Sequence, residues 1–476
     1  MSYLKYTFLF IIVSFTHGIS QTLVTSDLSI SLSKILIELN LGETVENGVD
    51  AYRITYTTTD LEGRLDTASG LLLIPQDIDR ALPQAIYQHG TVNSRSDVPS
   101  ELRGGWELGL ALSSFGFVTV APDFQGLGTS RGIHPYVHSD SQALAAIDLL
   151  IAVQPFLTEN GIDITEQLFI TGYSQGGHAA MAAHKVIQES YSDQFEVTAS
   201  SPMSGPYNIS GDMIDFTLGD KEFDFLSYLA WTILSYQRAY GDLYSGGIDE
   251  IYKDKYVGPI EQFANEEIDL GELNTLLRSL VLEESELALP RLMLKENILD
   301  IILSKADHPI NTALADNDLH NWIPQAPVRM MYCGMDEQVF FQNAITAEET
   351  MTSLGAQDVK AILIDEMGTH GSCIRPAFAA TVEFFQSFLD QTSSLYDHEL
   401  SQGINIYPNP ASEFLKIEFP NDYNPEVIQL VNIMGKTVID LKNQKEPISV
   451  SDLSPGIYLL QTFDEDKMTT NKVVIE

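Results

Sequence analysis

The chain has 476 residues, enough for one large domain with a buried core and an accessory domain. Its formal net charge of −40 is spread along the sequence and argues against nucleic acid or an anionic membrane surface as a partner.

Residues 1–20 have the composition of a secretory signal peptide. One lysine precedes an apolar segment at residues 8–15 that is too short to cross a membrane, and small residues come before Gln21. We therefore expect an exported mature chain without a transmembrane segment, in a compartment where disulfides can form.

Short apolar runs that alternate with helical segments predict the large domain, which is expected to span residues 21–390. Strands are expected at residues 51–58, 68–74, 84–88, 117–121, 168–171, 195–199, 328–332 and 359–364, and helices include residues 141–153 and 377–389. This alternation is typical of an α/β fold, with a mostly parallel sheet covered by helices on both faces.

A helical insertion interrupts the alternation at about residues 206–324. Residues 225–240 are apolar on nearly all sides, so this helix must be covered. A packed cap helix and a groove for an acyl chain are both compatible with the pattern, because ligands of α/β proteins bind at the carboxyl ends of the strands.

Residues 391–403 are polar and are expected to form a linker. Short strands between turns over residues 404–476 then predict a small β-sandwich. Its Tyr407-Pro408-Asn409-Pro410-Ala411 opening, its Pro455-Gly456-Ile457-Tyr458 strand and its basic-to-apolar end resemble the C-terminal sorting domain of type IX secretion cargo. The resemblance implies export by the type IX secretion machinery, followed by release or attachment to the cell surface.

The segment Gly172-Tyr173-Ser174-Gln175-Gly176 follows a predicted strand and precedes an alanine-rich helix. Strand, G-x-S-x-G and helix together form the pattern of a nucleophile elbow, in which the serine lies at the tip of a sharp turn. Side chains at Gly172 and Gly176 would collide in such a turn, and the helix N-terminus favours developing negative charge. Ser174 is therefore the expected nucleophile.

A serine nucleophile needs a base, and the base needs an acid that orients it. In enzymes with this elbow the acid and the histidine follow the serine in chain order, on loops after later strands. Asp336 follows the strand at 328–332 and His370 follows the strand at 359–364, so these residues are the expected acid and base.

Other residues compete for both roles. His320, near the end of the insertion, is an alternative base. Chain order and position disfavour four further histidines: His89, His134, His138 and His178. The alternative acids are Glu337, Asp365 and Glu366. No cofactor is expected, and no metal site either, because Pro135 makes a loop of the segment between His134 and His138 and no third ligand is evident.

An oxyanion hole needs two N–H donors, and the first should come from the residue after the nucleophile, Gln175. The second is expected from Gly90 or Thr91, in the loop after the strand at 84–88. Cys333 and Cys373 lie close in sequence to the expected acid and base, so a triad that brings the two loops together would allow a disulfide between them. We predict that Cys333 and Cys373 are bonded.

These motifs, with Gln88-His89-Gly90 and the loop at residues 121–128, resemble the α/β-hydrolase superfamily over about residues 25–390. Within it the chain is similar to secreted lipases and esterases that insert a helical cap before the acid-bearing strand. The resemblance implies Ser174 as nucleophile, His370 as general base and then acid, and Asp336 as the residue that orients it.

We therefore expect a secreted or cell-surface hydrolase that cleaves carboxylic esters, of lipids or of small molecules, through an acyl-enzyme. A serine exopeptidase of the same fold and a non-catalytic surface binding protein are the alternatives.

Overall fold

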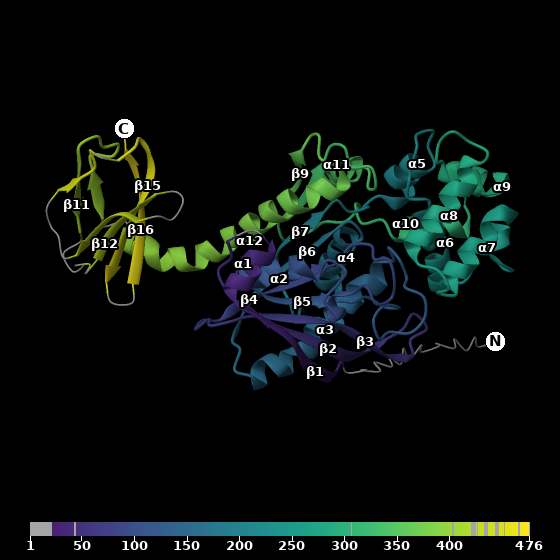
Figure 1. Cartoon of the computed structure of the whole chain (residues 1–476), viewed down its shortest axis with the longest axis horizontal. Coiled ribbons are helices and arrows are strands. Elements are labelled where there is room, and N and C mark those ends of the chain that lie inside the picture. Colours follow the sequence, from purple (N-terminus) through teal and green to yellow (C-terminus); the bar gives the residue numbers. More distant parts are fainter. Residues whose placement is uncertain are drawn as a thin grey trace, which may run out of the picture. The chain divides into compact units, whose positions relative to one another are not determined.

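The structure is a computed structural model that describes residues 21–41, 44–305, 307–401, 404–419, 425, 427–432, 437–442, 447–451, 453–464 and 467–475. The chain divides into two compact units, Met1–Glu383 and Phe384–Glu476. Each unit is described by itself below (Figure 1). The predicted signal peptide, residues 1–20, lies outside the described residues.

A nine-stranded sheet forms the centre of the first unit, in the order β1-β2-β3-β5-β4-β6-β7-β8-β9. Its strands are β1 Leu23–Leu32, β2 Val49–Thr59, β3 Leu65–Pro75, β4 Leu82–Gln88, β5 Val118–Pro122, β6 Ile164–Tyr173, β7 Val197–Met203, β8 Val328–Cys333 and β9 Val359–Asp365. β1, β2, β3 and β5 pair with one another in this order as antiparallel strands. The neighbouring pairs from β5 through β4, β6, β7 and β8 to β9 are all parallel. The predicted mostly parallel sheet is confirmed.

Helices cover both faces of this sheet, which is why its central strands read as apolar runs. All 7 residues of β4 are buried. On one face Leu72 and Ile86 share a core with residues of α3 (Ser139–Glu159), α4 (Gln175–Ser190) and α11 (Gln342–Leu354). On the other face Leu73 and Tyr87 lie against Gly109 of α2 (Trp106–Ser114). A short helix, α1 (Lys34–Leu41), joins β1 to β2.

Helix α3 is the one helix among the described residues that is long and apolar enough to cross a membrane by length and composition. Of its most apolar stretch, 67% is buried inside the unit. The core helix of a soluble domain has these same properties, and α3 packs as one.

The predicted cap lies between β7 and β8, where the described residues form helices and one isolated β-bridge, Tyr252–Leu294 (Figure 1). The helices are a π-helical turn Ile209–Met213, α5 Ile214–Thr217, α6 Leu226–Tyr240, α7 Asp254–Ala264, α8 Leu270–Leu282, α9 Glu296–Leu303 and α10 Pro309–Asp316, with 3-10 turns at Ile248–Glu250 and Pro290–Met293. The cap has a hydrophobic core of its own, to which α6 contributes Leu226, Trp231 and Tyr236. The nearly all-apolar helix of the sequence is therefore α6, and it is covered.

Helix α12 (His370–Ser401) follows β9 and runs through most of the segment predicted to be a linker, residues 391–403. Residues 402–403 of that segment lie outside the described part of the chain. The polar composition that indicated a linker thus belongs, up to Ser401, to a helix.

The second unit contains two small antiparallel sheets among its described residues. One has the order β10-β11-β14, and the other has the order β13-β12-β15-β16. The strands are β10 Asn405–Tyr407, β11 Phe414–Glu418, β12 Val427–Asn432, β13 Thr437–Lys442, β14 Ile448–Ser449, β15 Gly456–Asp464 and β16 Lys467–Ile475. Leu415 and Ile448 of the first sheet share one core with Leu430, Leu460 and Val473 of the second. This is the predicted β-sandwich arrangement.

Candidate active site

Ser174 stands alone between the end of β6 at Tyr173 and the start of α4 at Gln175. Its backbone has φ 62° and ψ −122°, a conformation that residues with a side chain rarely adopt. Hydrogen bonds hold it there, because the Ser174 N–H donates to the Met203 carbonyl at 3.0 Å and the Ser174 carbonyl accepts from the Gly177 N–H at 2.8 Å. The strained turn is the geometry expected of a nucleophile elbow.

Two glycines make this turn sterically possible. A Cβ atom at Gly172 would lie 2.2 Å from the Gly176 carbonyl oxygen, and one at Gly176 would lie 2.0 Å from the Gln88 carbonyl oxygen. Neither distance is compatible with a side chain, and the atoms met belong to backbone that cannot swing aside. The G-x-S-x-G spacing is therefore required by the approach of β4 to the turn.

The imidazole of His370 is hydrogen bonded to the carboxylate of Asp336. His370 Nδ1 lies 2.8 Å from Asp336 Oδ2 and 2.9 Å from Oδ1. Their side chains are only 7% and 1% exposed. The backbone N–H groups of Gln338 and Val339 donate to Oδ1 at 3.0 and 2.8 Å, which fixes the carboxylate as an acceptor. Nδ1 therefore carries the proton, and Nε2 is left as the basic nitrogen.

Tyr173 connects this pair to the elbow. Its hydroxyl donates to the His370 carbonyl oxygen at 2.7 Å, and the two rings are 5.0 Å apart between centroids. Because Tyr173 directly precedes Ser174, the loop of the predicted base is held beside the predicted nucleophile.

Glu337, an alternative acid, plays a different part. Its Oε2 accepts from the backbone N–H of His370 at 3.0 Å and does not bind the ring. Asp365, another alternative, accepts at Oδ1 from the Met367 backbone N–H at 2.9 Å. Of the carboxylates in these loops, Asp336 is the one that contacts the imidazole of His370.

The structure contains the predicted disulfide between Cys333 and Cys373. The sulfur atoms are 2.07 Å apart and both cysteines are fully buried. Cys333 ends β8 just before the Asp336 loop, and Cys373 lies in the first turn of α12 just after His370. The backbone reinforces this link, because the Met335 N–H donates to the Gly368 carbonyl at 3.1 Å.

The loop after β4 lies against the elbow. A Cβ atom at Gly90 would be 3.2 Å from the Tyr173 carbonyl oxygen and 3.7 Å from Ser174 Cβ. The next residue, Thr91, is hydrogen bonded through Oγ1 to the hydroxyl of Tyr136 at 3.0 Å. The three predicted oxyanion residues, Gly90, Thr91 and Gln175, therefore all lie in segments that adjoin Ser174.

The Gln175 side chain forms a contact that the sequence did not indicate. Its Nε2 lies 2.6 Å from Nε2 of His134, and His134 Nδ1 lies 2.7 Å from the Gln125 carbonyl oxygen. Burial lowers the pKa of His134 to about 3, so this ring is neutral, donates from Nδ1 and accepts from Gln175 at Nε2. His134 thereby fixes the side chain of the residue after the nucleophile.

The remaining candidate histidines have structural partners. His178 lies between Gln142 Oε1 at 3.1 Å and the Asn317 carbonyl at 2.9 Å, and burial lowers its pKa to about 4. His320, the alternative base, is 3.3 Å from the Tyr207 carbonyl through Nδ1. Among the described residues no group of three or more His, Cys, Asp or Glu side chains is arranged to hold a metal ion.

An apolar cavity of about 80 Å³ opens at Ser174. Ser174, Gln175, Gln338 and Val339 line it together with residues of α5, α6 and α10 and of the segments at residues 136–137, 206–213 and 223. The Tyr228 hydroxyl of α6 donates to Gln338 Oε1 at 2.9 Å, so the cap is tied to the loop of Asp336. Burial raises the pKa of Tyr228 to about 12, which keeps this phenol a neutral donor.

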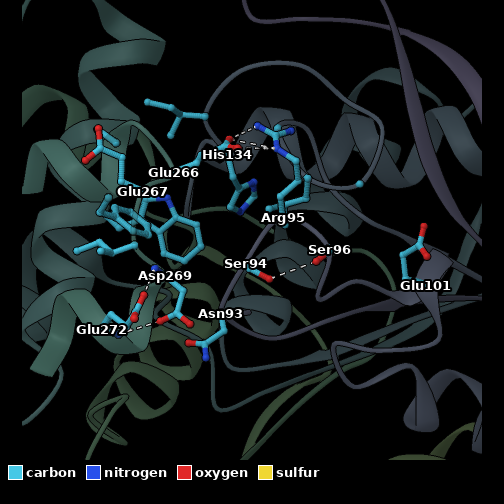
Figure 2. A pocket seen from close by; sticks show the side chains of 18 of the residues that line it. Asn93, Ser94, Arg95, Ser96, Glu101, His134, Glu266, Glu267, Asp269 and Glu272 are labelled. Carbon is cyan, nitrogen blue, oxygen red and sulfur yellow. Dashed lines mark hydrogen bonds and ion pairs between the residues drawn. The ribbon is translucent and has the colours of Figure 1, made fainter.

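A second, larger cavity of about 460 Å³ lies between residues 93–96, residues 126–134 and the cap at residues 263–272. Figure 2 shows its charged lining, in which Arg95 reaches Glu266. Arg95 also donates to the Ser130 and Gly132 carbonyl oxygens. His134 and Trp231 line this cavity, and His134 bonds to Gln175, which lines the one at Ser174.

Two family models match the sequence. The model of a family described as secretory lipase matches residues 108–374, and that of a secretion system C-terminal sorting domain matches residues 405–476. A search of curated proteins found no match.

Several solved structures are similar to the first unit. The rice cell wall degrading esterase LipA from Xanthomonas oryzae is 25% identical with a TM-score of 0.68, over 78% of this chain and 98% of LipA. Lipase A from Candida antarctica in its closed state is 16% identical with a TM-score of 0.53, over 76% and 82% of the two chains. The second likeness concerns the fold alone.

Proposed function

The chain belongs to the secretory lipase family, and we propose that it cleaves carboxylic esters through an acyl-enzyme formed on Ser174. The chain is a carboxylic-ester hydrolase that is secreted or placed at the cell surface. The Ser174–His370–Asp336 triad and the covalent acyl-enzyme are the part that we propose. It rests chiefly on the Asp336–His370 hydrogen bond, held beside the strained Ser174 turn by Tyr173 and the disulfide.

In the proposed first half-reaction, Ser174 Oγ attacks the ester carbonyl carbon while His370 Nε2 takes the hydroxyl proton. The negative charge that forms on the carbonyl oxygen is stabilised by the Gln175 N–H and by a donor from Gly90 or Thr91, each worth roughly 2.7 to 4 kcal/mol. His370 then protonates the leaving alcohol. Asp336 keeps the proton on Nδ1 and stabilises the imidazolium that forms.

In the second half-reaction, water attacks the acyl-enzyme with His370 again as base, and Ser174 is released with its proton. The sequence of steps needs no further cofactor, because each proton passes between Ser174, His370, the alcohol and water.

The exopeptidase alternative would need a carboxylate near Ser174 to bind the substrate amine. The cavity at Ser174 has no Asp or Glu among its described lining residues, and Glu337 is engaged with the backbone N–H of His370. These observations favour a neutral ester over an aminoacyl substrate. The C-terminal sorting domain supports export by the type IX machinery, which is the proposed partner.

The full mature chain and three variants, Ser174→Ala, Asp336→Asn and Glu337→Gln, test this proposal. We expect a fluorophosphonate to label Ser174 in the wild type, and nitrophenyl esters to be hydrolysed while aminoacyl anilides are not. Ser174→Ala should abolish labelling, and Asp336→Asn should lower kcat about 10⁴-fold because an amide disfavours the required tautomer.

Glu337→Gln is the matched control, because a glutamine oxygen can still accept the His370 backbone N–H. Its activity should stay within about tenfold of the wild type. An equal loss in Glu337→Gln and Asp336→Asn would reject Asp336 as the specific partner. Absence of labelling in the folded wild type would favour a non-catalytic binding protein.

A further inference from the structure

The cavity at Ser174 is small and apolar, and we propose that it restricts the enzyme to esters with short, uncharged acyl groups of about two to four carbons. This inference rests on the proposed function, because it takes Ser174 as the acylated residue. The alcohol part of the substrate is not restricted by this cavity.

The size of the cavity limits the acyl group. Its volume is about 80 Å³, and a dry apolar cavity of ~150 Å³ suffices to hold a benzene ring of six carbons. About half that volume accommodates about three or four carbons. A medium or long acyl chain would not be contained in this volume.

The walls are part of a packed core and cannot easily recede. Ile214 of α5, Leu229 of α6 and Leu314 of α10 line the cavity, and all three are buried members of the cap core. Protein interiors are close-packed, so a shift of one wall side chain has to be accommodated by its neighbours. The apolar walls also carry no charge that would pair with an ionised acyl group.

Hydrogen bonds hold the cap against both loops beside Ser174. Tyr228 of α6 donates to Gln338 next to the Asp336 loop at 2.9 Å. On the other side Tyr136 is bonded to Thr91 at 3.0 Å and stacks on Trp231 of α6 with ring centroids 4.5 Å apart. Contacts on two sides therefore hold the cap beside Ser174, and the size of the cavity is set by the folded cap.

The expected dependence on chain length has a distinct shape. Each methylene that fits should raise kcat/KM about fourfold, so activity should rise from acetate to butyrate. Further methylenes find no space, and kcat/KM for octanoate should be at least about tenfold below that for butyrate.

Substitutions at Thr232 can either enlarge or reduce the cavity. Thr232 lies on α6, lines the cavity and is half-buried, and its hydroxyl bonds only to the Tyr228 carbonyl of its own helix at 2.9 Å among the described contacts. Thr232→Ala enlarges the cavity and Thr232→Leu fills it, and both residues are good helix formers.

The test measures kcat/KM of the full mature chain on nitrophenyl esters from acetate to dodecanoate. Thr232→Ala should raise the hexanoate-to-butyrate ratio about fourfold, and Thr232→Leu should lower the butyrate-to-acetate ratio about tenfold. Leu276→Ala is the control, because Leu276 is 40% exposed on α8 and does not line the cavity. Its profile should match that of the wild type, and a thermal melt of each variant establishes folding.

A wild-type kcat/KM that keeps rising to decanoate or dodecanoate would overturn the short-acyl inference while leaving the ester hydrolase intact. Unchanged ratios in both folded Thr232 variants would overturn it as well. Hydrolysis of no ester, acetate included, would overturn the proposed function itself and the inference with it.

Discussion

Asp148 is an ionisable residue buried in the middle of α3. It is 3% exposed and its Oδ2 accepts from the Thr58 hydroxyl at 2.6 Å. Burial raises the pKa of Asp148 to about 6, because the charged carboxylate is poorly solvated there and the hydrogen bond only partly compensates.

A carboxyl with a raised native pKa destabilises the fold when it ionises. The native state binds this proton more tightly than the unfolded state does. The stabilisation that protonated Asp148 gives the fold is therefore complete below its unfolded pKa near 4, and it is lost as the pH rises through about 6. Asp148→Asn stays neutral, so its free energy of unfolding should rise relative to that of the wild type over this range. For a pKa shift from 3.8 to about 6, the difference should reach roughly 3 kcal/mol above pH 7.

Urea unfolding of the wild type and Asp148→Asn between pH 4 and pH 8 measures this difference. Asp27→Asn, at an exposed position of β1, is the control for the replacement of an aspartate by asparagine. A constant difference between Asp148→Asn and the wild type at all pH values would contradict a raised pKa at this residue.

The sequence indicated the residues of the proposed triad but not the contacts around them. Ser174 was proposed from its local motif, and Asp336 and His370 from their order after predicted strands. The Tyr173–His370 bond joins residues 197 positions apart, and the Gln175–His134 bond joins residues 41 positions apart. No local pattern reports such contacts, because they depend on how distant loops meet in three dimensions.

Among the elements, buried strands were easier to predict than exposed ones. β4 and β5 match the expected strands closely because both are apolar and wholly buried. β1 (Leu23–Leu32) was missed, since it lies at the sheet edge, is mostly exposed and pairs with β2 alone. The predicted linker was in large part the end of α12, because a polar composition is compatible with a helix as well as with a linker.

The disulfide is the covalent link between the elements that carry Asp336 and His370. It joins the end of β8 to the first turn of α12 across a sequence separation of 40 residues. Replacing both cysteines by serine should lower the free energy of unfolding by about 4 kcal/mol by the chain-entropy model. Looser loops should also lower kcat/KM, by up to about 100-fold if the imidazole is displaced by about 1 Å.

Denaturant unfolding and ester hydrolysis of the Cys333→Ser, Cys373→Ser double variant measure the two effects. Arg375→Ala, an exposed position in the same turn of α12, is the matched control and should change neither. Wild-type stability in the double variant would show that the loops are held by their backbone hydrogen bonds alone.

The molecule as a whole has separate hydrophobic cores for its two units. The sheet core and the cap core are formed entirely by residues of the first unit, and the core of the sandwich is formed entirely by residues after Ile404. Stability of the hydrolase should therefore not depend on the sorting domain, whereas export should.

A chain that ends at residue 390 tests this separation. We expect it to keep its melting temperature and to hydrolyse nitrophenyl esters within about twofold of the full chain, because no core residue of the first unit is removed. In a host with type IX secretion it should stay in the periplasm, as the sorting domain is missing. Full-length Ser174→Ala is the complementary control, since it should be exported but inactive. Export of the truncated chain would contradict the role of the sorting domain, and failure of the truncated chain to fold would contradict the independence of the two cores.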